Sequence, residues 1–403
     1  MSIFQYRAKK ASGETISGQI EAQNQEAAID LLSQRGLLPI ALEEKNTLAS
    51  SQGGQIKPRK ISSKEIYYFS QQLSSLMKAG IPILRALSLI SRQLTNPYFK
   101  YAIEDIERQI KDGQTLSNCL LNYPKIFNPF YVAMVHTGEE SGNLREILER
   151  VSRYQKNQEE IASKVRSALA YPLLMAAVGI GTVIFILTFV MPRVTSLFTS
   201  VNQELPLPTQ ILIAISTFMR NAWPWILLTL VALAFFVARW RESSVGRAAL
   251  SRLKLKVPLY GSFILKAELA KFCRALALLL HSGIPLIKGI RIAVPILDNQ
   301  TIQKELAACE KDLEAGGSLG SSLKKAGYIP EMMTNLLLIG EESGTFEEVL
   351  NDIADSYDQE TNETIKTLTT LLEPIMILTI GLIIGFIVIA MLLPIFQIDI
   401  AAQ

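Results

Sequence analysis

The chain of 403 residues is poor in the side chains that most enzymes and metal proteins need. It has two histidines and three cysteines, and Cys119, Cys273 and Cys309 are too far apart for a CxxC motif. A disulfide framework, a cysteine zinc site and chemistry that needs several imidazoles are therefore not expected. The patterns GxxxxGK[ST] and HExxH are absent as well, so ATP hydrolysis and zincin chemistry lack their residues. We predict a protein that is not an enzyme and that has no cofactor and no metal.

Charged residues are also scarce. They make up 19 % of the chain, against 49 % hydrophobic residues, and 40 basic and 37 acidic residues leave a net charge of +3. So apolar a composition is typical of a membrane protein, and so small a net charge gives no reason to expect a nucleic-acid partner. The first residues contain neither an apolar h-region nor a cleavage site, so we expect a cytoplasmic N-terminus and no secretory signal peptide.

Three long uncharged runs stand out from this composition. One run of 26 residues separates Arg166 from Arg193, and another of 25 residues follows Glu373. At about 1.5 Å per residue, either can cross a hydrocarbon core about 30 Å thick. A shorter run has Trp223 and Trp225 near its start, where tryptophan suits the membrane interface. We predict membrane spans at 169–192, 221–238 and 371–396.

Basic residues beside the spans indicate their orientation. The segment between the first two spans has two basic residues, Arg193 and Arg220, whereas the flanks on the other side have many more: Lys164, Arg166, Arg239, Arg241, Arg247, Arg252, Lys254 and Lys256. By the positive-inside rule, residues 193–220 form an external loop with an amphipathic segment, and both long polar segments are cytoplasmic. The tail, 397–403, is then external, and the protein is a multi-pass protein of the cytoplasmic membrane.

The sequence contains an internal duplication. A shift of 203 positions lays residues 69–84 on 272–287 with six of 16 positions identical, and after a change to 202 the motif GEESG recurs at 138–142 and 340–344. The same shift places Pro172 on Pro374, so the repeat includes a span. We therefore predict two cytoplasmic domains, copy 1 at 62–168 and copy 2 at 239–370, each followed by a membrane helix.

Helix-boundary residues recur within the copies. Ser62 and Glu65 suit a capping box, and Gly80, Gly113 and Gly138 are candidate helix ends. Apolar residues between these points keep helical spacing. We predict an all-α membrane protein with two repeated cytoplasmic helix bundles and three transmembrane helices.

The beginning of the chain has a different pattern. Alternating residues around Ser12-Gly13 predict a hairpin, and the stretch that follows predicts a short helix ending at Gly36 and then a strand. We expect a small α+β appendage at 1–45. Residues 46–61, rich in serine, glycine and basic residues, are typical of a linker.

Several short patterns together resemble a known family. They are the FxYxA opening at Phe4, Tyr6 and Ala8, GIP twice, GEESG twice, VMPRV after the first span and the ending LLPIFQ. They resemble the F family of type II secretion systems and its close relative, the inner-membrane platform protein of type IV pilus machines. The resemblance implies a platform that couples a cytoplasmic assembly ATPase to the incorporation of pilin or pseudopilin subunits. Other inner-membrane components and further copies of the chain are the expected partners. Membrane lipid is expected as well, because ten basic residues stand against two acidic ones from Arg241 to Arg291, where the chain leaves the second predicted span.

The repeated GEESG motif provides candidate docking residues. Acidic residues outnumber basic ones 15 to four between Asp298 and Glu363, which suits a basic partner such as the ATPase. Glycine and serine between helices are also ordinary turn and cap residues, so a purely structural role is the alternative. The docking candidates are Glu139, Glu140, Glu341, Glu342, Asp352 and Asp355.

Small residues four apart in the spans are candidates for helix packing, because they let two helices approach closely. They are Ala177 and Gly181 in the first span and Gly381 and Gly385 in the third. The resemblance also implies a calcium site near Glu149 in copy 1, but Arg153 one turn later opposes a hard cation, so no metal is predicted.

A membrane transporter or channel is the alternative function, because many transporters are built from repeats. The three uncharged runs contain no acidic or basic residue, and Glu373 lies at the very start of the third predicted span. This argues against a transporter unless the chain oligomerises.

Overall fold

The computed structural model describes residues 2–10, 15–22, 25–34, 36–45, 61–193 and 206–401. The predicted linker, apart from Ile61, lies outside these ranges, as do the tip of the predicted hairpin and residues 194–205 of the predicted external loop. The chain divides into two compact units, 1–60 with 94–101 and 61–93 with 102–403.

The N-terminal residues form a small sheet with one helix. Strand β1 (Ser2–Lys10) lies between β2 (Thr15–Ala22) and β3 (Leu37–Lys45) and pairs antiparallel with both. Helix α1 (Gln25–Gln34) connects β2 to β3, and its Leu32 is fully buried. Gly36 follows the helix at φ +70°, a left-handed conformation that glycine adopts without a Cβ clash.

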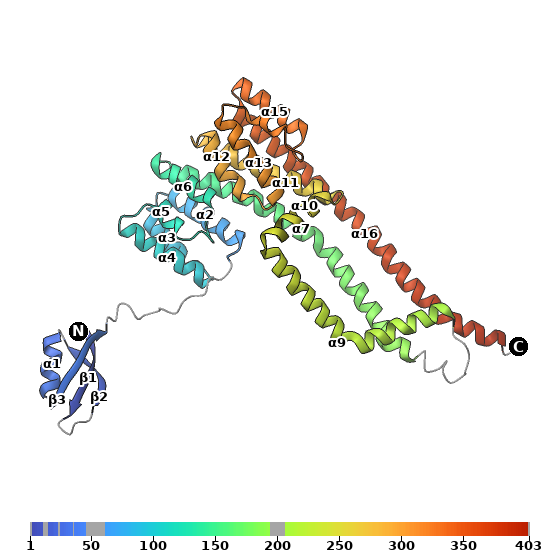
Figure 1. Ribbon diagram of the computed structural model, residues 1–403, viewed down its shortest axis with the longest axis horizontal. Coiled ribbons are helices and arrows are strands. Elements are labelled where there is room, and N and C mark those ends of the chain that lie inside the picture. The colour runs from blue at the N-terminus through green and yellow to red at the C-terminus, as the bar shows by residue number, and fades with distance from the viewer. Residues whose placement is uncertain are drawn as a thin grey trace. The chain divides into compact units, whose positions relative to one another are not determined.

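Copy 1 consists of short helices that lead into one long helix (Figure 1). The predicted capping box is confirmed, since the Ser62 backbone N–H donates to Glu65 Oε2 at 2.7 Å and the Glu65 N–H donates to Ser62 Oγ at 3.2 Å. Gly80 and Gly113 have positive φ and end helices as predicted. The helices are α2 (Ser63–Lys78), α3 (Ile83–Gln93), α4 (Pro97–Lys111), α5 (Leu116–Leu121), α6 (Pro129–Glu140) and α7 (Leu144–Phe185).

The prediction that Gly138 ends a helix is wrong. Gly138 lies inside α6, and a Cβ there would stand 3.0 Å from Leu144 Cα and 3.1 Å from Ile147 Cβ of α7. Glycine is present because α6 and α7 approach closely. The chain turns instead at Gly142, whose φ is +70°.

Copy 2 repeats this order of helices. Helices α11 to α16 follow one another as α2 to α7 do, and α10 (Ser244–Lys256) precedes them. Their bounds are α11 (Tyr260–His281), α12 (Leu286–Ala293), α13 (Gln300–Glu314), α14 (Leu319–Leu323), α15 (Glu331–Ser343) and α16 (Phe346–Ala401), with a 3₁₀ turn at Val294–Ile296.

The copies have corresponding cores as well. Phe69 in α2 and its counterpart Phe272 in α11 are both buried. In copy 1 the ring of Phe69 lies 5.8 Å from that of Phe127, between centroids. Cys119, Cys273 and Cys309 are buried free thiols. They occupy core positions, as small hydrophobic side chains do.

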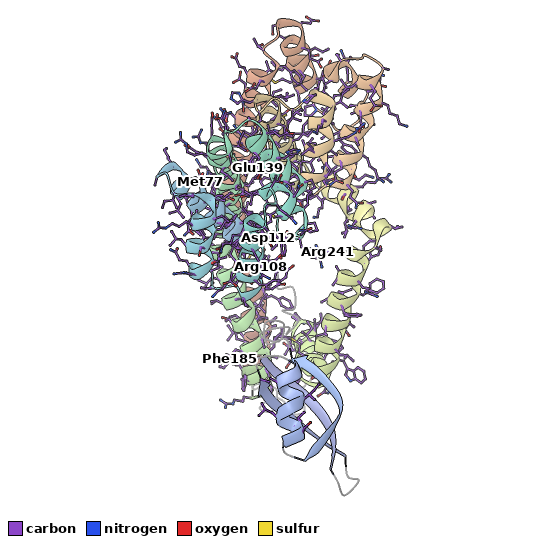
Figure 2. All side chains as sticks on the ribbon, turned by 90° about the vertical axis from the view of Figure 1, so that its left-hand side faces the viewer. Met77, Arg108, Asp112, Glu139, Phe185 and Arg241 are labelled. Atoms are coloured by element: carbon purple, nitrogen blue, oxygen red, sulfur yellow. The ribbon has the colours of Figure 1, made fainter. Side chains whose placement is uncertain are left out.

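The last helix of each copy continues into an apolar segment. Helix α7 runs on through a π-helix at Ile186–Val190, and α16 runs without interruption from the polar part of copy 2 through the predicted third span. The stretches Leu144–Arg193 and Phe346–Leu393 are long and apolar enough to cross a membrane. Phe185 lies on the outer surface of α7, 56 % exposed (Figure 2), as expected of a side chain that faces lipid.

Helix α9 (Leu207–Glu242) contains the predicted second span and runs back toward copy 2 (Figure 1). Near its start it packs against the distal parts of α7 and α16. The hydroxyls of Thr209 and Ser216 donate to the carbonyls of Ala390 and Leu187, both at 2.5 Å. A buried apolar cluster surrounds these bonds: Leu187, Met191, Leu212, Ile387 and Ala390.

Candidate coupling site between the two repeats

The GEESG turn has the same construction in both copies. Its first glycine permits a close crossing of helices, since a Cβ on Gly340 would stand 3.0 Å from Val349 Cγ2 and 3.3 Å from Phe346 Cα. Gly138 has the equivalent contacts in copy 1. Its last glycine, Gly142 or Gly344, adopts a left-handed φ of +70° or +74°. These positions need glycine for steric reasons.

The first glutamate of each motif binds the N-terminus of a neighbouring short helix. Glu139 accepts hydrogen bonds from the N–H groups of Leu116 (2.5 Å) and Ser117 (3.0 Å) at the start of α5. Glu341 likewise accepts from Leu319 (2.7 Å) and Gly320 (3.3 Å) at the start of α14. A carboxylate there satisfies N–H groups that have no partner within the helix and interacts favourably with its dipole. Glu139 and Glu341 thus hold the turn to the bundle.

The second glutamate faces solvent in both copies. The side chain of Glu140 is 70 % exposed, and its Oε1 lies 3.7 Å from Nε2 of His136. Glu342 is exposed too. The serine between glutamate and glycine bonds within its own helix, as Ser141 Oγ does to the carbonyl of Thr137 at 2.8 Å. Of the four repeated glutamates, Glu140 and Glu342 are therefore the ones free to meet a partner.

The two aspartates among the docking candidates also differ from each other. Asp352 is exposed on α16. Asp355 is exposed as well, but its Oδ1 accepts a hydrogen bond from Arg274 Nη2 of α11 at 2.7 Å. Asp355 is thus part of an ion pair within copy 2.

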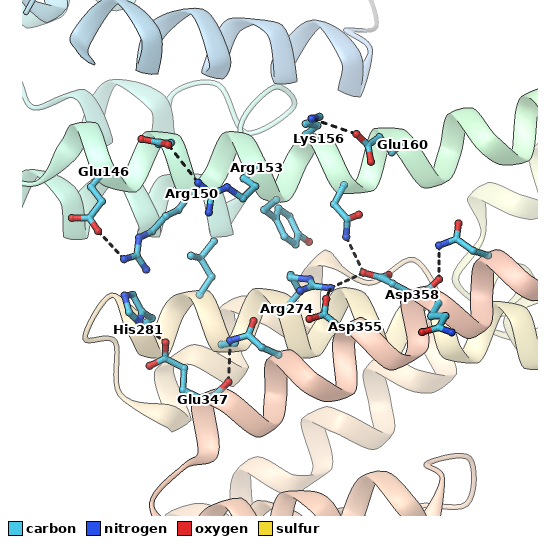
Figure 3. Close-up of a pocket in the computed structure, with 18 of the residues that line it drawn as sticks. Glu146, Arg150, Arg153, Lys156, Glu160, Arg274, His281, Glu347, Asp355 and Asp358 are labelled. Atoms are coloured by element: carbon cyan, nitrogen blue, oxygen red, sulfur yellow. Dashed lines mark hydrogen bonds and ion pairs between the residues drawn. The ribbon is translucent and has the colours of Figure 1, made fainter. Parts of the chain in front are cut away.

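A groove lies between the two copies, with a volume of about 1110 Å³. Figure 3 shows its walls, which are the polar N-terminal half of α7 on one side and α11 with α16 on the other. Arg150, Arg153 and Lys156 project from α7, while Asp355 and Asp358 project from α16. Glu146, Glu149 and Glu160 of α7 balance its three cations, whereas acidic residues outnumber basic ones on the other wall.

Each wall neutralises much of its own charge. On α7, Arg150 pairs with Glu146 at 2.7 Å, Arg153 with Glu149 at 3.4 Å, and Lys156 with Glu160 at 3.6 Å. In copy 2, Arg274 bonds both Asp355 and Asp358 at 2.7 Å. The ion pairs therefore stabilise each copy more than they hold the copies together.

Two hydrogen bonds connect α7 to α16 across the groove. Asn157 Nδ2 donates to Asp358 Oδ2 at 2.9 Å, and Lys164 Nζ donates to Asn362 Oδ1 at 3.0 Å. Asp358 is labelled in the view of the groove in Figure 3. Asp358 receives bonds from both copies, because the same oxygen also accepts from Arg274. It is one of the residues at which the repeats meet.

Some buried polar atoms in this region lack a partner within the described residues. They include Oη of Tyr154 and Nε of Arg274. Burial raises the pKa of Tyr154, so the phenol stays protonated. Unpaired polar atoms make an interface costly to keep closed, and a polar interface between domains is typical of parts that move relative to each other.

The carboxylate that family resemblance connects with calcium is surrounded by cations. Glu149 lies 3.4 Å from Arg153 Nη2 and 3.8 Å from Lys78 Nζ. Two positive groups beside one carboxylate oppose a hard divalent cation. These residues do not fit a calcium site.

The membrane parts of α7 and α16 meet at a glycine that the sequence patterns did not indicate. A Cβ on Gly179 would stand 2.7 Å from Ile380 Cδ1, so glycine allows this close contact. A Cβ on Gly181, Gly381 or Gly385 would have no neighbour within 4 Å among the described residues, and Ala177 is exposed. Within the described residues α7 and α16 thus approach closely at Gly179, and helix packing at the four predicted residues stays a prediction.

Sequence reasoning also missed the residues of the groove, Asn157, Arg274 and Asp358. The duplication contained a signal for two of them. Arg274 aligns with Gln71, and Asp358 aligns with Lys156, so charge changes between copies at both positions. A residue that departs from its repeat partner is a candidate for a contact that one copy makes and the other does not.

The structure is that of a duplicated helical protein in which each helix bundle continues into a long apolar helix. A profile described as "Type II secretion system (T2SS), protein F" matches residues 69–192 and 272–394, and one for that protein's N-terminal domain matches residues 1–43. The chain belongs to the type II secretion system protein F family.

Relatives from two kinds of machine match almost end to end. The type IV pilus assembly protein PilC of Thermus thermophilus is 34 % identical over 401 residues, 99 % of this chain and 98 % of the relative. The type II secretion system protein F of Vibrio cholerae is 30 % identical over 403 residues, 99 % of each chain. PilC of Myxococcus xanthus is also 30 % identical, over 99 % of this chain and 96 % of the relative.

Proposed function

We propose that the protein is the inner-membrane platform of a type II secretion or type IV pilus machine. In this role it couples a cytoplasmic assembly ATPase to the incorporation of pilin-like subunits and performs no catalysis itself. The relatives named for these two machines support the role, since they match over nearly the whole chain.

The observation that carries this proposal is the continuity of α7 and α16. Each helix begins beside a GEESG turn and ends in an apolar segment, without a break between them. At about 1.5 Å per residue, the 42 residues of α7 extend about 60 Å. In our proposal a displacement of the cytoplasmic end is carried along the continuous helix into the membrane. Pro172 lies inside α7 and removes one backbone hydrogen bond, so it is the point at which this helix bends most easily.

The groove supplies the freedom that such coupling needs. Copies 1 and 2 are connected across it by hydrogen bonds, and their ion pairs are mainly internal. In our proposal, ATPase movement shifts one copy against the other, and α7 and α16 then shift against each other about their contact at Gly179.

The acidic surface of copy 2 is the proposed docking face for the ATPase. Glu342 and Asp352 are exposed there, and Glu140 is exposed at the equivalent turn of copy 1. Glu139, Glu341 and Asp355 support this face indirectly, because their carboxylates hold neighbouring helices in place. Complementary charge at such a face speeds association and selects the partner.

We further propose the topology that the basic flanks predict. The cytoplasmic parts are a small α+β domain at 1–45, copy 1 at 62–168 and copy 2 at 239–370. Membrane helices at 169–192, 221–238 and 371–396 place residues 193–220 and 397–403 outside. The exposed apolar side chains of α9 support the second span, and include Leu228, Val231, Leu233, Phe235 and Phe236.

An insertion tests the coupling directly. Seven residues placed after Arg166 lengthen α7 by about two turns, so an alanine-rich insert keeps the helix and nearly keeps its rotational phase. A glycine- and serine-rich insert of equal length interrupts it. We expect secretion or piliation to survive better with the helical insert, at equal protein levels and equal ATPase binding. Equal activity of both inserts would contradict transmission through α7.

A further inference from the structure

Helix α10 is the most basic surface segment of copy 2 and follows directly on α9. No acidic residue lies between Ser243 and Ala267. Helix α10 itself contains four basic residues, all of them exposed: Arg247, Arg252, Lys254 and Lys256. The mechanism proposed above does not use it.

Two glycines set the position of α10 between its neighbours. A Cβ on Gly246 would stand 2.0 Å from the carbonyl oxygen of Trp240, and one on Gly261 would stand 2.2 Å from that of Leu255. Both contacts are too close for any other residue, so α10 is bounded by a tight corner at each end. Figure 1 shows that α10 leaves the direction of α9 rather than extending it.

One side of α10 is held against α13. Ser251 is buried, its Oγ accepts from the N–H of Gln300 at 3.2 Å, and its carbonyl accepts from Asn299 Nδ2 at 3.2 Å. Ala248 and Leu255, which share this side, are partly covered. The rotation of α10 about its axis is thereby determined.

The opposite side combines apolar and basic residues. Val245 and Leu253 are 74 % and 60 % exposed, with the exposed Ala249 between them, one turn from each. Arg252 and Lys256 lie on the same side. In water this apolar surface is unfavourable, whereas a helix at a membrane surface presents such a face to lipid.

This surface continues the apolar surface of α9. Exposed apolar side chains follow α9 as far as Phe236, and Trp240 and Arg241 stand at its end. Beyond α10, the exposed Val257, Leu259 and Tyr260 continue the same mixture. If α9 spans the bilayer, α10 begins at the level of the lipid headgroups.

We infer that α10 is an interfacial helix that binds anionic phospholipid. Val245, Ala249 and Leu253 enter the boundary between headgroups and acyl chains, and Arg252 and Lys256 pair with lipid phosphates. Because α10 is bonded to α13, this contact holds copy 2 at the membrane surface. The inference rests on the proposed second span in α9.

The test uses the full chain in lipid nanodiscs with a fluorophore on one introduced cysteine. The three native thiols are buried, so an exposed cysteine is labelled selectively. Ala249→Cys reports on α10, Leu233→Cys on the proposed span, and Glu331→Cys, at the start of α15, on a surface in water. Phospholipid with brominated acyl chains quenches a label that contacts lipid.

We expect quenching at position 249 close to that at 233 and well above that at 331. Brominated phosphatidylglycerol should quench position 249 at least about twofold more than brominated phosphatidylcholine at equal mole fraction, because each nearby cation favours anionic lipid. The Arg252→Gln/Lys256→Gln variant should lose this preference. Lys288→Gln/Lys304→Gln, which removes two exposed charges from α12 and α13, should keep it.

Other outcomes separate this inference from the proposed topology. A label at 249 as unquenched as the one at 331, while 233 is quenched, would overturn the interfacial helix and leave the platform intact. No quenching at 233 would remove the second span and the inference with it. Equal quenching by both lipids, or loss of ATPase binding in Arg252→Gln/Lys256→Gln without any change in quenching, would overturn the anionic-lipid site and assign the charges to a protein partner.

Discussion

At the scale of single residues, identical letters in a repeated motif have different roles. Glu139 and Glu140 are neighbours in the sequence, but the first accepts two backbone hydrogen bonds and the second is exposed. The same division holds for Glu341 and Glu342. Mutation of both members of a pair would therefore mix a change of stability with a change of docking.

Separate substitutions should distinguish these roles. Glu139→Gln keeps one acceptor oxygen but turns an amide group toward a backbone donor, so one charge-assisted bond at the start of α5 is lost. For a half-buried group we expect the free energy of local unfolding of α5 to fall by about 1 kcal/mol. Local opening of α5 then becomes about fivefold more frequent. The rate of thiol labelling of Cys119, buried in α5, measures this opening.

Glu140→Gln is the matched control and should leave the labelling rate within error of the wild type. If Glu140 and Glu342 bind the ATPase, their double replacement should reduce ATPase binding while Cys119 stays protected. Equal labelling rates in Glu139→Gln and Glu140→Gln would contradict the structural role of Glu139.

A buried carboxylate predicts a pH effect. Burial raises the pKa of Glu268 in α11 above its ordinary value, although its carboxylate accepts a bond from the N–H of Asp298 at 2.9 Å. The folded state therefore holds this proton more tightly than the unfolded chain. Protonated Glu268 therefore stabilises the folded state at low pH. This contribution to the free energy of unfolding is lost as the pH rises from about 4.5 through the raised pKa.

Glu268→Gln keeps a side-chain oxygen that can accept from the N–H of Asp298, and it removes the buried carboxylate charge. Between pH 5 and pH 8 the wild type should lose more thermal stability in detergent than this variant does. Glu348→Gln, on the exposed side of α16, should behave as the wild type. A larger loss in Glu268→Gln than in the wild type would show that the carboxylate is needed in its charged form.

At the scale of elements, close helix crossings depend on individual glycines. Gly179 faces Ile380 where α7 meets α16, whereas Gly181, two residues further on, has open space beside it in the described structure. The two positions are equally apolar and equally small. They form a matched pair for testing where the membrane helices touch.

Leucine at the two positions should have different effects. Gly179→Leu forces α7 and α16 apart, and overpacking of this kind costs about 1–3 kcal/mol. We expect a melting temperature several degrees lower in detergent, and little change for Gly181→Leu. Loss of secretion or piliation in Gly181→Leu at normal stability would assign that surface to another membrane protein. Equal destabilisation would contradict the crossing at Gly179.

At the scale of the whole molecule, the number of membrane crossings between the two copies decides whether they lie on the same side. An even number places both copies in one compartment. Each copy ends in a membrane helix, so a further span is needed to return the chain if both copies lie on one side. Helix α9 occupies that place in the sequence and packs against the distal ends of α7 and α16. The proposed platform depends on this arrangement, because an ATPase can drive both copies only from one compartment.

Reporter fusions test this arrangement. Fusions at Gln155, Gln203, Asn351 and Gln403 should report inside, outside, inside and outside, because basic residues concentrate on the flanks of the cytoplasmic segments. An external report at Asn351 would exclude a shared compartment for the copies. Flux of a small solute into vesicles that contain the purified chain alone would favour a transporter over a platform.

Sequence alone determined the features that depend on local pattern and on repetition. Apolar runs indicated helices long enough for a membrane, alignment of the chain with itself indicated two copies, and Ser62 with Glu65 indicated a helix start. These features can be predicted from sequence because hydrophobic spacing, capping and turn geometry depend on residues close together in the chain. The family resemblance was of the same kind, since short motifs carried it.

The tertiary structure alone decided what distant residues do to one another. It separated Glu139 from Glu140, because only the folded bundle brings α5 to one of two adjacent carboxylates. It assigned Gly138 to a crossing rather than a helix end, and it placed Asp358 between Asn157 and Arg274, 201 and 84 positions away. Contacts over such separations follow from how helices pack, and side-chain spacing along one helix does not contain that information.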